Sequence, residues 1–346
     1  MIKILHVTDM HIRHDGRLFY SSGRKFQNGF IRNGFNCVNI SDRDVTKLKK
    51  TFFDISGKKA LLNSITSTIE NFKPDIVIFG HVDKLDYIDL ARIKEKFSNI
   101  IFAQWFLDAL IKDGGPDYEK HKTRFMNKYQ ICDFNFVTTF PDSLDFVEKE
   151  KTFYIPNPID SSIETLKVFK NQFFEYDVFI AVSHGQHRAT LKRGYVDERH
   201  EIVQALNSSL KVNSFGFNNR NPIWGADFFN EINKCKMGIN LSRGKPIKYY
   251  SSDRISSLLG SGLLTFLDSK YSFQDFLNKD EVVYFDDIND LNEKLIFFSK
   301  NDSERSKIAQ KGYEKSHEIF NSNLISKYMI DQIMGKKIDY KIPWRT

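Results

Sequence analysis

The sequence is poor in cysteine and has no long apolar run. It contains only three cysteines, Cys37, Cys132 and Cys235, in 346 residues. An odd number of widely separated thiols argues against a disulfide framework or a zinc knuckle and is typical of a reducing compartment. No run of about 18 apolar residues is present, so we expect no transmembrane helix. The first residues also lack the regions of a secretory signal, so we expect a cytoplasmic protein.

Charge of one sign is not in large excess either. The chain has 51 Lys and Arg against 44 Asp and Glu, a formal net charge of +7. This surplus favours phosphate-bearing ligands or peripheral contact with an anionic membrane, and a basic surface kept for solubility explains it equally well. No stripe of basic and aromatic residues indicates a nucleic-acid surface, so we expect no nucleic-acid partner.

Short apolar runs alternate with amphipathic helical patterns along the chain. The first apolar run, 2–7, is followed by a polar loop over 8–19, a helical pattern over 22–33 and a second apolar run over 36–40. This strand, loop, helix, strand order predicts a parallel, doubly wound α/β sheet. Ligands of such sheets bind at the carboxyl ends of the strands, where the polar loop lies.

One proline-rich segment divides this alternation into two halves. Two prolines within three residues, in Pro156-Asn-Pro-Ile-Asp160, stop regular structure, and the same rhythm restarts after them. The chain is also longer than one typical core requires. We therefore expect an N-terminal domain over 1–157 and a C-terminal domain over 158–320.

The second half contains the most informative stretch. A buried strand pattern over 237–241 is followed by a loop rich in cations and hydroxyls, and then by a short helical pattern over 254–260. A helix N-terminus behind such a loop is suited to bind an anion, and we expect a nucleotide diphosphate there. The candidate ligands are Lys248, Tyr249, Ser251, Ser252 and Arg254.

Several motifs of this half resemble a known family. The residues that carry the resemblance are Asn240-Leu-Ser242, Arg254-Ile255, Gly262, Asp286-Asp287 and the helical phrase Arg305-x-x-Ile308-Ala309-x-x-Gly312. They are similar to the C-terminal half of GT-B glycosyltransferases of the spore-maturation-protein (CgeB-like) type, within the group 1 glycosyltransferases. The hinge at 156–160 also resembles the interdomain linker of many GT-B enzymes. One position departs from the family, since Ser257 stands where a glutamate commonly holds the donor ribose.

The resemblance implies a fold and a reaction. The fold is two Rossmann-like domains facing across a cleft, with the C-terminal helix, about 321–346, crossing back to the N-terminal domain. The reaction is transfer of a sugar from a nucleotide-sugar donor to a hydroxyl of a glycan or lipid-linked saccharide. No Asp-x-Asp motif stands where it would carry a metal, so we expect neither a metal nor another cofactor.

A basic loop near the start of the second domain fits the same reaction. Arg188 and Arg193 form an Arg-x4-Arg-Gly phrase after an apolar run, with Lys192 between them. The phrase is similar to the Arg-x4-Lys-Gly of GT-B donor domains. Sugar transfer leaves two negative charges on the departing nucleotide, and cations placed there stabilise the transition state. A solvated approach to a helix is the alternative.

The first domain offers candidates for the acceptor side of the reaction. Gly16 in the polar loop would let the backbone approach the donor phosphates. His81 and Asp15 are the first choices for a general base, followed by His14 and Asp9, because both residue types suit this work near neutral pH when desolvated. In addition, Asp108 and Asp117 near a glycine-rich turn are candidates to contact the acceptor sugar.

Two other functions compete with this interpretation. Asp9-Met-His11 after an apolar strand resembles the first motif of calcineurin-like metallophosphoesterases, which bind two metal ions. That family needs Gly-Asp where this chain has Gly80-His81, and its later histidine motifs are missing. The departure at Ser257 keeps open a protein that binds sugar nucleotides without catalysis.

Overall fold

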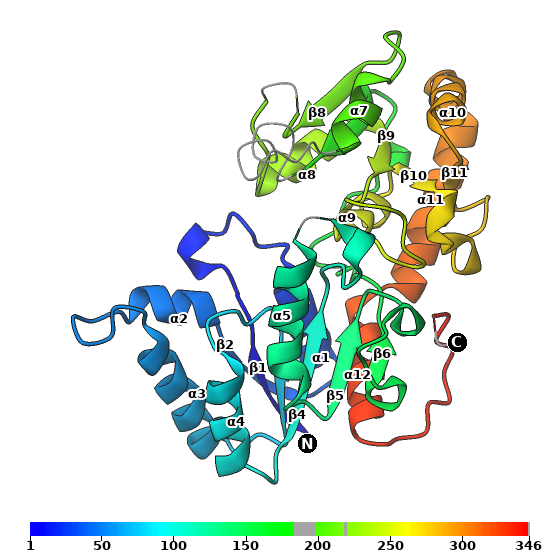
Figure 1. The fold of residues 1–346 in the computed structure, drawn as a ribbon. Coiled ribbons are helices and arrows are strands. Elements are labelled where there is room, and N and C mark those ends of the chain that lie inside the picture. Colours follow the sequence, from blue (N-terminus) through cyan, green and yellow to red (C-terminus); the bar gives the residue numbers. More distant parts are fainter. Residues whose placement is uncertain (116, 183–197, 218–219, 345–346) are drawn as a thin grey trace. The chain divides into compact units, whose positions relative to one another are not determined.

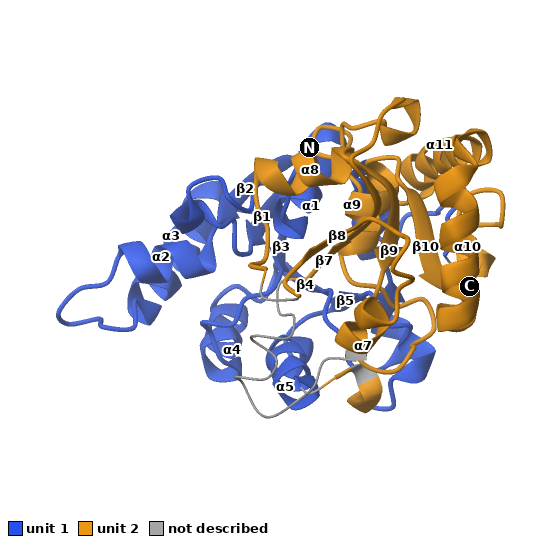
Figure 2. Cartoon of the chain, turned by 90° about the horizontal axis from the view of Figure 1, so that it is seen from above, with its two compact units in different colours: residues 1–110, 117–158, 322–346 blue, residues 111–116, 159–321 orange. Residues whose placement is uncertain are grey.

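The computed structural model describes residues 1–115, 117–182, 198–217 and 220–344. The chain divides into two compact units (Figure 2). Unit 1 comprises residues 1–110, 117–158 and 322–346, and unit 2 comprises residues 111–116 and 159–321. The last segment of the chain thus returns to the first unit, and a short excursion from the first half joins the second.

Unit 1 is built on a six-stranded sheet in the order β2-β1-β3-β4-β5-β6, with every neighbouring pair parallel. The strands are β1 (Lys3–Val7), β2 (Asn36–Ile40), β3 (Ile76–Phe79), β4 (Ile101–Phe106), β5 (Phe134–Val137) and β6 (Thr152–Tyr154). The helices are α1 (Ser22–Arg32), α2 (Asp42–Leu48), α3 (Lys58–Phe72), α4 (Tyr87–Lys96), α5 (Tyr118–Tyr129) and α12 (Ser322–Ile333) (Figure 1).

Both faces of this sheet are buried, as the apolar strand sequences predict. Leu5 and Val7 belong to a core cluster with residues of α3 and α4. The alternate residue His6 points to the other face, where its ring lies 5.5 Å from that of Phe30 in α1. Helix α12 packs on α1 so closely that a Cβ at Gly29 would lie 2.3 Å from the Ser322 carbonyl oxygen.

Unit 2 is built on a five-stranded parallel sheet in the order β8-β7-β9-β10-β11. The strands are β7 (Tyr176–Ala181), β8 (Val212–Phe215), β9 (Cys235–Asn240), β10 (Leu264–Asp268) and β11 (Val283–Phe285). The helices are α7 (Glu198–Gln204), α8 (Ala226–Asn233), α9 (Arg254–Gly260), α10 (Ile288–Lys300) and α11 (Asp302–Ile319). The predicted doubly wound α/β class is therefore correct for both halves.

Helix α2 was not predicted from the sequence. Helix α2 follows β2 directly, and its residues Asp42 and Asp44 are buried despite their charge. Helices are predicted from apolar residues at helical spacing, and the buried face of α2 carries carboxylates instead. Among the described residues, no helix combines the length and apolar character needed to cross a membrane.

Candidate functional site

In unit 2, the loop between β9 and α9 is held together by its own polar groups. Asn240 at the end of β9 donates from Nδ2 to Ser251 Oγ at 2.9 Å, and that hydroxyl donates to the Ser252 carbonyl at 2.9 Å. The Ser252 N–H donates to Ser242 Oγ at 3.2 Å. The two ends of the loop are thus joined, and the side chain of Ser251, predicted to bind phosphate, is engaged within the loop. Ser257 in α9 is buried.

The guanidinium of Arg254 braces this loop against two strands. Its Nε donates to the carbonyl of Ala181, the last residue of β7, at 2.6 Å, and Nη1 donates to the Leu241 carbonyl just after β9 at 2.7 Å. Nη1 also donates to Ser252 Oγ at 2.9 Å. The sequence predicted Arg254 as a ligand of the nucleotide diphosphate. Its hydrogen bonds to backbone carbonyls instead indicate a structural role at the carboxyl ends of neighbouring strands.

Tyr249 belongs to the core of unit 2. Its side chain is 3% exposed, its hydroxyl donates to Asp275, and its ring lies 4.5 Å from that of Phe276. Burial, together with the bond to Asp275, raises the pKa of Tyr249 to about 12. This environment argues against the predicted role as a platform for the base or the sugar, because the ring is already packed against protein. Lys248 is exposed, with Nζ 4.6 Å from the centre of that ring.

The excursion of residues 111–116 contributes to the same loop. The Lys245 N–H donates to the Asp113 carbonyl at 2.8 Å, and Lys245 Nζ lies 3.4 Å from Asp113 Oδ2. A Cβ at Gly115 would lie 3.0 Å from Arg243 Cδ. The cations after β9 are therefore partly engaged by this segment. The other predicted donor ligands, Arg188, Lys192 and Arg193, lie outside the described residues and remain predictions.

In unit 1, the polar loop after β1 is fixed by a buried ion-pair network. Both oxygens of Asp9 accept hydrogen bonds from the guanidinium of Arg13, each at 2.7 Å, and Oδ1 also accepts from the His11 N–H at 2.9 Å. Arg13 Nη1 donates in addition to Asp44 Oδ1 at 2.8 Å. Burial raises the pKa of Asp9, but these partners outweigh it and hold that pKa below its usual value.

This network argues against the predicted role of Asp9 as a general base. A carboxylate with a guanidinium across both oxygens is a poor general base, because a competing cation already occupies its lone pairs. The same guanidinium stands where a metal would have to approach Asp9. The Asp-x-His phrase therefore stabilises the loop here, which argues against the metallophosphoesterase interpretation.

His14, Asp15 and Gly16 lie in a turn of the same loop, in which Asp15 and Gly16 are exposed and His14 is half-buried. His14 ends a short 3-10 helix, and its ring lies 5.7 Å from that of His11. Asp15 and Gly16 have φ angles of +50° and +79°. A Cβ at Gly16 would meet nothing within 4 Å, so the glycine serves the left-handed backbone rather than close packing. The roles predicted for these three residues remain predictions.

His81 lies after β3, at the carboxyl edge of the sheet. Its Nε2 accepts the Leu107 N–H at 3.0 Å, and its ring stacks on Phe106 at 4.7 Å. The other nitrogen, Nδ1, therefore carries the hydrogen and lies 3.4 Å from Asp108 Oδ2. Burial lowers the pKa of His81 to about 4, so the imidazole is neutral at pH 7. Since the lone pair on Nε2 is used by the backbone, the geometry argues against His81 as the base itself.

Asp108 lies where two imidazoles meet. His121, in the first turns of α5, places Nε2 3.6 Å from the same Asp108 Oδ2. The Asp108 side chain is 37% exposed, against 24% for His81 and 20% for His121. The sequence predicted Asp108 only as an acceptor contact and did not single out His121, because its neighbours Asp108 and His81 lie 13 and 40 positions before it and form no local pattern with it.

Other charges are buried near this edge. Asp83 bonds to Arg43 through both oxygens at 3.0 Å and to Arg124 Nη2 at 2.8 Å. Asp42 is fully buried, and burial followed by the charge of Asp9 raises its pKa to about 7. Burial lowers the pKa of Lys128 to about 8. The carboxyl edge of unit 1 is thus rich in ionisable groups, as an acid–base site requires.

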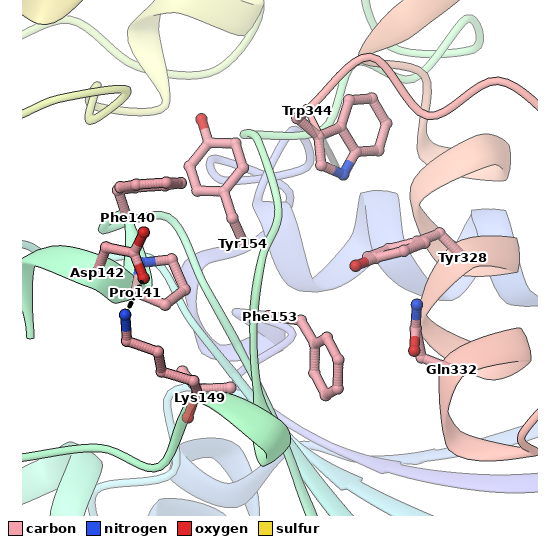
Figure 3. A pocket seen from close by; sticks show the side chains of 10 residues that line it. Phe140, Pro141, Asp142, Lys149, Phe153, Tyr154, Tyr328, Gln332 and Trp344 are labelled. Carbon is pink, nitrogen blue, oxygen red and sulfur yellow. Dashed lines mark ion pairs between the residues drawn. The ribbon is translucent and has the colours of Figure 1, made fainter. Parts of the chain in front are cut away.

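A separate cavity of about 290 Å³ lies beside the edge strand β6 (Figure 3). Figure 3 shows Tyr328 and Gln332 of α12 on one side and Phe140 and Tyr154 on the other. Its rim carries the ion pair between Lys149 Nζ and Asp142 Oδ1 at 2.7 Å, and further lining residues are Pro141, Thr152, Phe153 and Trp344. None of the residues singled out as site candidates by the sequence lines it.

The sequence was compared with protein-family models and with curated proteins. Residues 193–330 match the model of a family described as glycosyl transferase-like. No curated protein matched the sequence.

Solved structures match over most of the chain. HepE from Anabaena, in complex with UDP and glucose, has a TM-score of 0.58 at 9% identity, with 97% of this chain and 100% of that chain covered. A putative UDP-N-acetylglucosamine 2-epimerase from Listeria monocytogenes has a TM-score of 0.53 at 12% identity, with 99% and 100% covered.

TarM has a TM-score of 0.53 at 13% identity over 79% of this chain, which spans only 58% of TarM. Identities this low establish the fold and not the reaction. The chain has the GT-B fold of two Rossmann-like domains, and residues 193–330 of its second half are similar to the glycosyl transferase-like family.

Proposed function

We propose that the protein transfers a sugar from a nucleotide-sugar donor to a hydroxyl of an acceptor. The observation that carries the proposal is that most of the family match, residues 193–321 of 193–330, falls on the unit that holds the loop between β9 and α9. That loop ends at the N-terminus of α9 with Lys248 exposed beside it. Unit 2 is accordingly the nucleotide-binding unit, and unit 1 is the acceptor unit.

We propose that the predicted donor ligands of unit 2 are of two kinds. Arg254, Ser251 and Tyr249 hold the loop and are proposed to shape it rather than to bind charge. Lys248, with Arg188, Lys192 and Arg193 of the earlier basic loop, is proposed to neutralise the leaving diphosphate. A leaving group neutralised by side-chain cations needs no metal, so we propose that transfer is metal-independent.

The acceptor is proposed to be a glycan or a lipid-linked saccharide. The net charge of +7 supports peripheral contact with an anionic membrane surface, without deciding between these acceptors. HepE was solved with UDP and glucose, which supports a hexose carried by a uridine nucleotide as the first donor to test.

The test is a turnover assay with purified protein. Donor nucleotide sugars are incubated with oligosaccharide acceptors, with and without EDTA, and products are followed by mass spectrometry and NMR. Transfer that survives EDTA supports the full proposal. Inversion at C2 of the donor sugar without transfer would indicate the chemistry of an epimerase, whose fold is shared. Nucleotide binding without any turnover would indicate a sugar-nucleotide-binding protein.

A further inference from the structure

We propose that Asp108 is the catalytic residue that receives the proton of the acceptor hydroxyl, and that His81 and His121 are positioning residues that orient its carboxylate. This inference rests on the proposed sugar transfer and names the acid–base group of that reaction. It assigns the base to a residue that sequence analysis considered only as a sugar contact.

Three separate elements bring these side chains together. His81 follows β3, Asp108 follows β4, and His121 lies in α5. Because β3 and β4 are neighbouring parallel strands, the residues just after them lie at the same edge of the sheet. His121 lies one helical turn inside α5, which returns the chain to unit 1 after the excursion of residues 111–116.

The two histidines hold one oxygen of the carboxylate. His81 Nδ1 lies 3.4 Å and His121 Nε2 lies 3.6 Å from Asp108 Oδ2. The Leu107 N–H fixes the tautomer of His81, so that its hydrogen is on the nitrogen that faces Asp108. Both contacts are made to Oδ2, and Oδ1 is the oxygen assigned to the acceptor proton.

The other candidates in unit 1 are less suited to this work. Both oxygens of Asp9 bond to Arg13, and Nε2 of His81 is used by a backbone N–H. Asp42 has no exposed surface. Asp108 combines a side chain that is 37% exposed with two imidazole neighbours on one of its oxygens. Burial raises the pKa of Asp108, but the positive charges of His81 and His121 in their protonated forms, with those of Arg124 and Arg43, outweigh burial and hold that pKa below its usual value.

The step balances as a single displacement. The acceptor oxygen forms a bond to the anomeric carbon while its proton passes to Asp108 Oδ1. The bond from the anomeric carbon to the phosphate oxygen breaks, and its electron pair leaves with the nucleoside diphosphate. Attack on the face opposite the leaving group inverts the anomeric configuration. The proposal therefore also predicts that the enzyme is inverting.

The first test compares Asp108→Asn with the matched control Asp145→Asn, an exposed acid of the same unit. Asp108→Asn is expected to lower kcat for transfer by about 100-fold to 10,000-fold. The dissociation constant for the nucleoside diphosphate, measured by calorimetry, is expected to stay within twofold. Asp108→Glu should recover part of the rate, and Asp145→Asn should resemble wild type. Circular dichroism and a melting curve confirm that each variant folds.

The second test addresses the histidines. His81→Gln and His121→Gln should each lower kcat more than they change the KM for the donor. Because the imidazoles lower the pKa of Asp108, their loss should move the acidic limb of the kcat profile to higher pH, with Arg124 and Arg43 still present. A merely structural histidine would leave that limb in place.

Two results would overturn the inference while leaving sugar transfer intact. One is wild-type kcat in a folded Asp108→Asn variant, and the other is a product with the anomeric configuration of the donor, seen by NMR. If the wild-type protein transfers no sugar from any nucleotide donor, the proposed function itself is wrong, and this assignment with it.

Discussion

The carboxyl edges of the two sheets use their polar residues in different ways. In unit 1, the loop after β1 is held by charges that pair with charges, as Arg13 does with Asp9 and Asp44. In unit 2, the loop after β9 is held mainly by hydrogen bonds that Arg254 donates to backbone carbonyls and Asn240 donates to a hydroxyl. The first arrangement leaves many ionisable groups at the edge, and the second leaves a preorganised loop with exposed lysine. One edge suits proton transfer, and the other suits binding of a diphosphate.

The largest effect on stability is expected at Arg13, which holds the loop after β1 in unit 1. Replacing Arg13 by Ala leaves two buried carboxylates without their guanidinium, and we expect a loss of about 3–5 kcal/mol in the free energy of unfolding. Urea unfolding at pH 7 measures it, with the exposed Arg24→Ala as a control expected to change by about 0.5 kcal/mol or less. An equal effect of both variants would show that the network is not structural.

The pH dependence of this network has a definite sign. Burial raises the pKa of Asp44, but its hydrogen bonds prevail and lower it to about 2. A carboxyl group with a lowered folded pKa contributes stability that is present above its unfolded pKa of about 3.9 and is lost as pH falls toward 2. This loss should be smaller in Arg13→Ala, because part of the network is already absent.

The next largest effect is expected at Arg254. Its bonds to two strand-end carbonyls predict that Arg254→Ala lowers the stability of unit 2 by about 3 kcal/mol, and donor affinity falls as a consequence of the disturbed loop. The control is Lys248→Ala, which should lower nucleotide affinity with no change in the melting temperature. An Arg254→Ala variant that melts like wild type but binds nucleotide weakly would make Arg254 a phosphate ligand after all.

Replacement of Asp42 is expected to raise stability, by less than the losses expected at Arg13 and Arg254. Burial, then the charge of Asp9, raises its pKa to about 7. Because the folded pKa exceeds the unfolded one, this carboxyl destabilises the protein increasingly as pH rises from about 4 to 7. Asp42→Asn should therefore stabilise unit 1 at pH 8 by on the order of 2 kcal/mol and have little benefit at pH 4. Denaturant unfolding at both pH values tests this, and a gain that is the same at both would contradict it.

The smallest effect is expected at Tyr249. Tyr249→Phe removes the hydroxyl that donates to Asp275 and should lower stability by about 1 kcal/mol without changing nucleotide affinity. The exposed Tyr87→Phe provides a matched control. A large drop in nucleotide affinity in Tyr249→Phe with unchanged stability would restore the predicted ligand role.

Local patterns predicted most of the elements in both halves. The spacing of apolar residues and the restart after Pro158 indicated two doubly wound units, because buried parallel strands need continuous apolar runs. The stretch over 254–260 was predicted as a helix and is α9 with the same bounds. Helix α2 was missed, because its buried acids pair with residues far away in the sequence.

The sequence predicted the roles of individual charged residues much less well than the helices and strands. Arg254 and Asp9 look like ligands in the sequence, since an arginine near hydroxyls or an aspartate after a strand is chemically suited to binding. In the structure, Asp9 bonds to Arg13 of its own loop, and Arg254 bonds to the carbonyls of Ala181 and Leu241, which are distant from it in the sequence. Asp108 and His121 were not joined by any motif, because only the packing of β4 against α5 brings them together.

The sequence by itself determined that this protein is a pair of parallel α/β units, because strand and helix periodicity are local properties of the chain. The tertiary structure alone decided which charges are consumed in holding loops and which remain at the edge of a sheet. That choice depends on which hydrogen-bonding partners the fold brings within about 3 Å of each side chain. No local pattern of residues contains that information.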